Sequence, residues 1–168
     1  MEEILDVVNK HNRIIGTEKR SVIHKKLLMH RAVLLFVMDE KGRILLGRRS
    51  KEKEEYPDCW SFPVAGHVKA GESADDTIRR ETKEESGLRI GAEFVKLLPA
   101  ERESGNHFSY IYITRIKDPL NTLKLDKKET SRLALWPKED VEKRLESEAD
   151  FSPIFAAAFR WLVENGKI

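Results

Sequence analysis

The order of apolar and polar residues along the chain predicts a set of strands flanked by helices. Arg31–Met38 is an almost continuous apolar run, which is typical of a strand buried on both faces. A turn at 39–42 leads to a second strand at 43–48. Further strands are expected near 61–68, 90–99, 107–116 and 131–136. Ahead of them, 3–8 and 13–16 predict a short hairpin around Lys10–Asn12.

Helical patterns stand before and after these strands. Residues 18–28 are the first candidate, and 138–147 and 152–165 are the last two. Phe155, Phe159 and Leu162 recur at helical spacing in the last segment, so their apolar stripe should pack on a sheet. Helices around a mixed set of strands indicate a layered α/β fold.

One more helix is expected at about 74–86. Ser73 is a good residue to begin it, and Asp76 three positions later offers the second half of a capping box. Gly87 can adopt the left-handed conformation that ends a helix. These end signals predict the helix independently of any hydrophobic pattern.

The inward face of this helix begins apolar and ends acidic. Ala74, Ile78 and Thr82 share this face. Glu81 and Glu85 continue the same stripe, with Glu84 at its edge. Carboxylates gathered on an inward face repel one another unless a cation neutralises them. Because all-oxygen ligands suit a hard divalent ion, we expect a site for Mg²⁺, with Mn²⁺ as the second choice.

The stretch from 66 to 88 also has the spacing of a known motif. Its fixed positions are Gly66, Glu72, Arg80, Glu81, Glu84, Glu85, Gly87 and Leu88. This pattern is the Nudix box, and the chain resembles a Nudix hydrolase; Thr82 stands where an apolar residue is usual. The resemblance implies a Nudix-type α/β/α sandwich with a mixed sheet. It also implies a single Nudix domain over 1–168 that includes the hairpin at 3–16.

The activity implied by the resemblance is hydrolysis of a diphosphate linkage, most simply in a nucleoside diphosphate or a related nucleotide derivative. Glu81, Glu84 and Glu85 would then be metal ligands, with Glu84 or Glu85 placing the attacking water. The carbonyl of Ala65 would be an additional ligand. The structural positions of the box would be Gly66, Glu72, Arg80 and Gly87, with Glu72 paired to Arg80. A second base could come from Glu101 or Glu103.

A longer stretch, from Val7 to Glu85, resembles the isopentenyl-diphosphate isomerase-like branch of the Nudix proteins through runs such as HRAVLLF and VAGHVKAGE. That branch contains isomerases and hydrolases. The isomerases use a cysteine just before the Gly-His pair, where this chain has Ala65. Alanine has no ionisable group, so we expect a hydrolase. An isopentenyl-diphosphate delta-isomerase is the alternative, followed by a non-catalytic nucleotide-binding module, which would be expected to have lost box glutamates.

The same branch gives two further expectations. Its isomerases bind a second metal through three histidines, at positions similar to His24, His30 and His67, although a lone histidine is more often packed in a core. Its diphosphate-holding bases match Arg49 and Lys53, in a loop that also has the pattern of a solvated charge run. Trp60 and Phe62 could either stack on a base or fill the core.

Composition narrows the classes of protein to which the chain can belong. A chain of 168 residues with 40% hydrophobic composition suits one domain, and its net charge of +2, with bases interspersed among acids, gives no support for nucleic-acid binding. The single Cys59 excludes an internal disulfide. No apolar segment is long enough for a membrane span and the N-terminus is acidic, so we expect no membrane contact and a cytoplasmic location. The expected partner is a small diphosphate; the oligomeric state is left open, and a homodimer is compatible with it.

Overall fold

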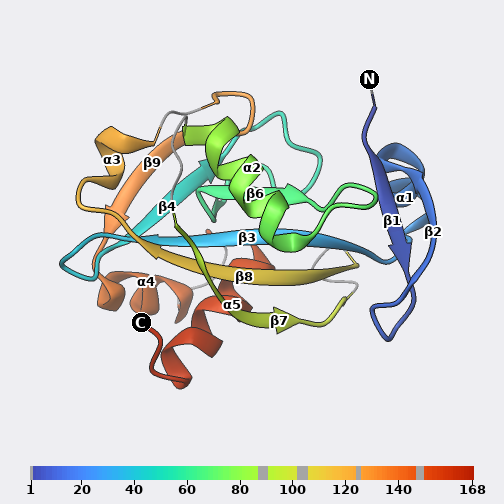
Figure 1. Ribbon diagram of the computed structural model, residues 1–168. Coiled ribbons are helices and arrows are strands. Elements are labelled where there is room, and N and C mark those ends of the chain that lie inside the picture. The colour runs from blue at the N-terminus through green and yellow to red at the C-terminus, as the bar shows by residue number, and fades with distance from the viewer. Residues whose placement is uncertain (1, 87–90, 102–105, 124–125, 147–149) are drawn as a thin grey trace.

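A computed structural model of the protein describes residues 2–86, 91–101, 106–123, 126–146 and 150–168 (Figure 1). The central strand is β3 (His30–Met38), and it pairs in parallel with β8 (His107–Arg115) along its whole length. β8 pairs antiparallel with β7 (Glu93–Leu98). These three strands form one side of the sheet, and β7 is its edge strand.

The sheet branches on the other side of β3. Residues 32–35 of β3 pair with β6 (Val64–His67), whereas residues 37–38 pair with β4 (Ile44–Arg49). β4 then pairs with β5 (Trp60–Ser61) and with β9 (Thr130–Trp136). All of these pairings are antiparallel, so the parallel β3–β8 pair makes the sheet mixed.

The strand expected at 61–68 is in fact two strands. β5 pairs with β4 and β6 pairs with β3, and they are separated by Phe62 and Pro63. Proline has no N–H to donate to a neighbouring strand, which explains a break at this point. The other predicted strands are confirmed to within a few residues, whereas the short helix α3 (Pro119–Thr122) was not predicted.

The predicted N-terminal hairpin is confirmed as a separate two-stranded sheet. It consists of β1 (Ile4–Val8) and β2 (Ile14–Lys19), and α1 (Arg20–Lys26) follows. The helix is shorter than the expected 18–28 because β2 continues through Lys19 and Leu27 takes a left-handed conformation, with φ of 53°. Asn12 at the hairpin tip accepts bonds from Arg31 of β3, which ties the hairpin to the main sheet.

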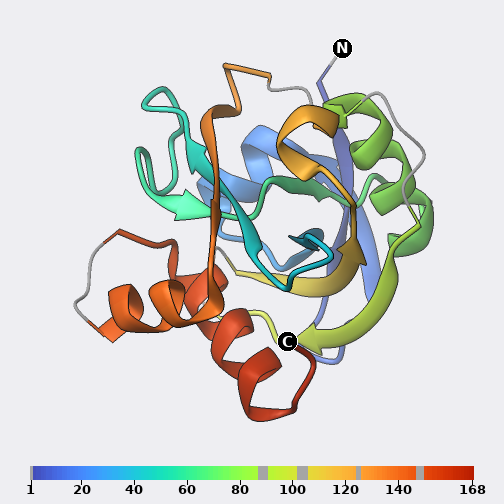
Figure 2. The same ribbon diagram turned by 90° about the vertical axis from the view of Figure 1, so that its left-hand side faces the viewer.

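Successive residues of β3 pack against opposite layers, as the period of two requires. Leu34, Phe36 and Met38 join the core under α5 (Pro153–Glu164). Val33, Leu35 and Val37 join the core under α2 (Ala74–Ser86). Figures 1 and 2 show α2 on one side of the sheet and α4 (Lys138–Glu146) with α5 on the other. The α/β/α arrangement with a mixed sheet is therefore confirmed.

No helix in the described part of the chain is both long enough and apolar enough to span a membrane.

Candidate active site

Helix α2 begins where the capping signals predict. The Ser73 hydroxyl accepts a bond from the Asp76 N–H at 3.1 Å and donates to the Asp76 carboxylate at 2.6 Å. Asp76 thus contacts the Ser73 hydroxyl through both its backbone N–H and its carboxylate. The helix extends to Ser86, while Gly87 lies outside the described residues. Both the start and the expected length of the helix are confirmed.

The acidic end of the predicted stripe is indeed buried at its first position. Glu81 is only 9% exposed and lies among buried Thr77, Ile78 and Thr82 on the same side of the helix. Burial raises the pKa of the Glu81 carboxyl, against the opposing effect of the Arg80 guanidinium. A carboxylate in this position needs positive charge close by to stay ionised.

Gly66 explains how strand and helix come together at this point. A Cβ added to Gly66 would lie 2.1 Å from Cδ of Glu81, far inside van der Waals contact. The backbone of β6 therefore presses directly against the Glu81 side chain, and only glycine leaves room for it. Ala65 directly precedes Gly66 in β6.

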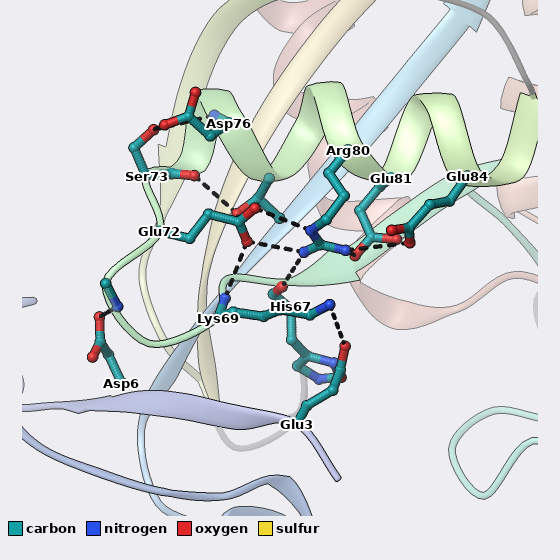
Figure 3. A network of polar contacts seen from close by, with 12 residues as sticks. Glu3, Asp6, His67, Lys69, Glu72, Ser73, Asp76, Arg80, Glu81 and Glu84 are labelled. Atoms are coloured by element: carbon teal, nitrogen blue, oxygen red, sulfur yellow. Dashed lines mark hydrogen bonds and ion pairs between the residues drawn. The ribbon is translucent and has the colours of Figure 1, made fainter. Parts of the chain in front are cut away.

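Arg80 connects the box carboxylates (Figure 3). Its Nε and Nη2 each donate to a different oxygen of Glu72, both at 3.0 Å. Its Nη1 donates to Glu81 at 2.7 Å and to Glu84 at 3.4 Å. Although burial opposes it, the bonds from Arg80 and Thr77 lower the pKa of Glu72. Two-point contact with Glu72 fixes the guanidinium, so it can hold Glu81 in one place.

The loop before α2 is also held from the opposite side by the N-terminal hairpin. Lys69 Nζ lies 3.4 Å from the Glu3 carboxylate, and the N–H of Gly71 donates to Asp6 at 3.3 Å (Figure 3). The Ala70 N–H donates to the Ile4 carbonyl at 2.9 Å. The hairpin therefore supports the loop that leads into the acidic helix.

The structure describes the other predicted glutamate ligands, Glu84 and Glu85, to different degrees. The Glu84 side chain is 58% exposed and shares Arg80 with Glu81. Glu85 belongs to the last turn of α2, but its side chain lies outside the described residues. Among the described residues, Glu81 and Glu84 are joined through Arg80, and their carboxylate oxygens are the kind of ligand that Mg²⁺ or Mn²⁺ prefers, so these residues fit a hard divalent ion.

A second cluster forms at the last residue of β6, His67. His24 of α1, His30 of β3 and His67 of β6 each offer a ring nitrogen, and these atoms all lie within 4.8 Å of one another. Nε2 of His24 is 3.3 Å from Nε2 of His67. Nε2 of His30 is buried and, among the described residues, has no hydrogen-bond partner. The structure thus brings together the three histidines singled out in the sequence.

The outer nitrogens of two of these rings are bonded to oxygen. Nδ1 of His30 lies 3.1 Å from the Leu28 carbonyl, and Nδ1 of His24 lies 3.4 Å from the Glu55 carboxylate. Such contacts fix a ring's orientation and leave its Nε2 as the inner donor atom. Burial lowers the pKa of His30 to about 4 and holds the pKa of His67 well below its usual range. Both rings are therefore neutral at pH 7, the form that binds a metal.

His107 joins this cluster, which sequence analysis did not predict. It lies opposite His30 in the β3–β8 register, and the two ring centroids are 5.4 Å apart. Its Nδ1 lies 2.9 Å from the Ser109 hydroxyl, and burial lowers its pKa to about 4. Parallel pairing of β3 with β8 creates this contact between residues far apart in the chain, so no local pattern could reveal it.

The basic loop candidates have partners within the protein. The Arg49 guanidinium donates to the carbonyls of Glu55 and Tyr56, which closes the loop that follows β4. Lys53 contacts the Glu129 carboxylate. Binding of a diphosphate by these two side chains would require them to exchange these contacts.

The remaining candidate residues are two aromatic side chains and two loop glutamates. Phe62 packs between Phe36 and Phe155 in the core, and Trp60 is 2% exposed. Of the two alternatives for these aromatic residues, the structure therefore favours core packing. Glu101 is exposed, and Glu103 lies outside the described residues.

Comparison with known proteins agrees with this geometry. The family model for the NUDIX domain matches residues 28–158. The chain therefore belongs to the Nudix family, as its box predicts. An uncharacterised Nudix hydrolase of Streptomyces coelicolor is 30% identical, covering 94% of this chain and 87% of the relative. An isopentenyl-diphosphate delta-isomerase of Burkholderia multivorans is 31% identical, covering 98% of this chain and 93% of the relative.

Solved structures show the same fold. DR0079 from Deinococcus radiodurans has a TM-score of 0.80 at 21% identity, covering 94% of this chain and 98% of that chain. The NUDIX domain of Shewanella oneidensis NrtR, solved with ADP ribose, has a TM-score of 0.62 at 15% identity, covering 80% of this chain and 86% of that chain. At these identities the likeness establishes the shared architecture.

Proposed function

We propose that this Nudix family member is a pyrophosphohydrolase that uses Mg²⁺, or Mn²⁺, to cleave a diphosphate linkage in a nucleoside diphosphate or a related nucleotide derivative. The observation that carries the proposal is the buried Glu81 carboxylate, pressed against Gly66 and joined through Arg80 to Glu84. An acidic group held this firmly is suited to binding a divalent ion. Membership of the Nudix hydrolase family supports the same conclusion.

In this proposal, the side chains of α2 divide the work. Glu81, Glu84 and Glu85, with the Ala65 carbonyl, hold the ion, which when bound neutralises phosphate oxygens and acidifies a water. Arg80 keeps Glu81 against β6 through its contacts with Glu72. Water attacks phosphorus, the bond from phosphorus to the bridging oxygen breaks, and Glu84 or Glu85 accepts the proton of the water.

Ala65 favours hydrolysis over isomerisation. Moving a double bond needs an acid held against carbon, and the methyl group of Ala65 packs with the core under α5. Hydrolysis needs no side-chain group there. The nucleotide substrate is supported by the ADP ribose held by the NrtR domain of the same fold.

We also propose that His24, His30 and His67 hold a second metal ion. Their nitrogen donors suit Zn²⁺ or another borderline metal better than Mg²⁺.

Equilibrium dialysis with Zn²⁺ in excess Mg²⁺ tests the second metal site directly: wild-type protein and the exposed His11→Ala control should retain Zn²⁺. His30→Ala should bind it at least about tenfold more weakly. If His30→Ala retained as much Zn²⁺ as the wild type, the proposal of a second metal site would be wrong. This cluster and the 31% identity to the isomerase of Burkholderia multivorans are the observations that favour the alternative isomerase function.

A product-release screen with Mg²⁺ tests the main proposal. It should cover nucleoside di- and triphosphates, sugar nucleotides, dinucleoside polyphosphates and prenyl diphosphates. For sugar nucleotides and dinucleoside polyphosphates, which have no free terminal phosphate, a phosphatase is added to release phosphate from the products. It is left out for substrates with a free terminal phosphate, which it would attack directly. We expect turnover of at least one nucleotide derivative that disappears with EDTA. Absence of turnover across all classes with both Mg²⁺ and Mn²⁺ would refute the hydrolase proposal.

A further inference from the structure

A pocket lies at the branch of the sheet formed by β4, β5 and β9, beside α4. Its volume is about 440 Å³, which is in the range of small-molecule sites. Neither the box glutamates nor the clustered histidines line it. It is therefore a separate candidate binding site.

Two arginines face each other across adjacent strands in this pocket. Arg48 of β4 is the register partner of Arg132 of β9. Like charges directly opposite each other in a sheet destabilise it, so such a pair needs compensation. Arg48 obtains it from Asp58 at 3.0 Å and Asp150 at 2.8 Å. Among the described residues, Arg132 has no carboxylate within ion-pair distance.

The pocket has an excess of positive charge. Its lining includes four bases, Arg48, Lys51, Arg132 and Arg144, against the carboxylates of Asp58 and Asp150. Both carboxylates already bond Arg48. Among the described lining residues, bases therefore outnumber carboxylates, which suits a phosphate monoester with up to two negative charges near neutral pH.

Two indole rings hold the guanidinium groups in place. The Arg132 guanidinium carbon lies 4.9 Å from the ring centroid of Trp60, and that of Arg144 lies 4.3 Å from Trp136. The two indoles are themselves in edge-to-face contact at 4.9 Å. A guanidinium stacked on a ring keeps its N–H donors in its own plane, directed past the ring edge. Positioned this way, the donors lose little freedom on binding oxygen.

We propose that this pocket binds the phosphate group of a small phosphate monoester, with Arg132 as the principal contact. The planar donors of a guanidinium recognise the oxygens of phosphate in pairs, and a dianion suits a lining rich in arginine. A phosphate diester carries one negative charge and two bulky substituents, so nucleic-acid backbone is a poorer match. The site is independent of the proposed hydrolytic chemistry.

Titration calorimetry with methyl phosphate tests the proposal, with EDTA present so that the acidic site binds no metal-bridged phosphate. Arg132→Ala is the informative variant because the described contact of its side chain is with Trp60 alone. Lys96→Ala is the matched control: Lys96 makes the same kind of contact with Trp161, at 4.8 Å, outside the pocket. Arg132→Gln provides a second variant if the alanine protein does not fold.

We expect methyl phosphate to bind wild-type and Lys96→Ala protein saturably and equally, and to alter tryptophan emission through Trp60 and Trp136. The Arg132 variants should bind at least about tenfold more weakly, as expected for loss of a charge-assisted contact. Dimethyl phosphate should bind at least about tenfold more weakly to the wild type. No saturable binding, equal binding by a folded Arg132 variant, or equal affinity for the diester would overturn the proposal.

Discussion

The backbone at Gly66 and the carboxyl group of Glu81 are in direct contact, and a methyl group on Gly66 would lie 2.1 Å from Cδ of Glu81. This contact fixes the acidic end of α2 against β6. It also makes the geometry of the site sensitive to a single methyl group.

Gly66→Ala should therefore displace Glu81 from its position. We expect overpacking to lower the free energy of unfolding by about 1–3 kcal/mol, and misplacement of the carboxylate to lower turnover by roughly a hundredfold. Chemical denaturation and steady-state kinetics measure the two effects. Gly16→Ala is the control, since nothing lies within 4 Å of its added methyl. If Gly66→Ala matched Gly16→Ala in both measurements, the contact would not matter to the site.

The carboxylates at the end of α2 should be needed for activity and not for folding. Glu85→Gln is expected to lower turnover at least about a hundredfold, because amide nitrogen replaces a ligand or base oxygen. Glu84→Gln should have a similar effect. Circular dichroism should show an unchanged fold, and Glu139→Gln on the exposed surface of α4 should retain full activity. Near wild-type turnover in Glu85→Gln would invalidate the assigned site.

Arg49 and Lys53 stay predictions as diphosphate contacts. If they bind substrate, Arg49→Ala should lower kcat/KM mainly through KM, by about 1.5–3 kcal/mol of transition-state free energy. The carbonyls of Glu55 and Tyr56 that Arg49 bonds would then be released on substrate binding. Steady-state kinetics of Arg49→Ala and Lys53→Ala measures this effect. Unchanged kinetic constants in both variants would mean that these side chains have a structural role only.

The buried histidines should make stability depend on pH. Burial lowers the pKa of His30 and His107 from 6.5 to about 4, so between these values the unfolded chain binds more protons than the folded protein. Stability of the metal-free protein should then rise from pH 4 to 6.5 and level off above, with each ring accounting for a rise of about 3 kcal/mol in the free energy of unfolding.

Urea denaturation in EDTA across this pH range measures that dependence. His107→Gln should flatten the profile, whereas the exposed His11→Gln should leave its slope unchanged. A wild-type profile with no rise between pH 4 and 6.5 would contradict the burial of neutral rings.

Much of the fold could be predicted because its signals are local. The apolar run of β3, the hairpin turn, and the cap at Ser73 each depend on a few neighbouring residues. The position of Glu81 on the buried side of α2 followed from helical periodicity alone.

The parts that escaped prediction depend on contacts between distant segments. His107 meets His30 only because β8 pairs with β3, and Arg132 meets Arg48 only because β9 pairs with β4. Arg49 donates to two backbone carbonyls because of the path that the loop after β4 takes. The charge pattern of that loop does not specify its path.

The most direct test of the central claim is ³¹P NMR of the purified protein with Mg²⁺, first with the best nucleotide substrate and then with isopentenyl diphosphate. Product analysis by chromatography follows the second reaction. We predict cleavage of the nucleotide diphosphate linkage, abolished by EDTA, and no conversion of isopentenyl diphosphate to dimethylallyl diphosphate, even with added Mn²⁺ or Zn²⁺. Isomerisation at an enzymatic rate that survives Cys59→Ser, without nucleotide cleavage, would contradict the hydrolase assignment.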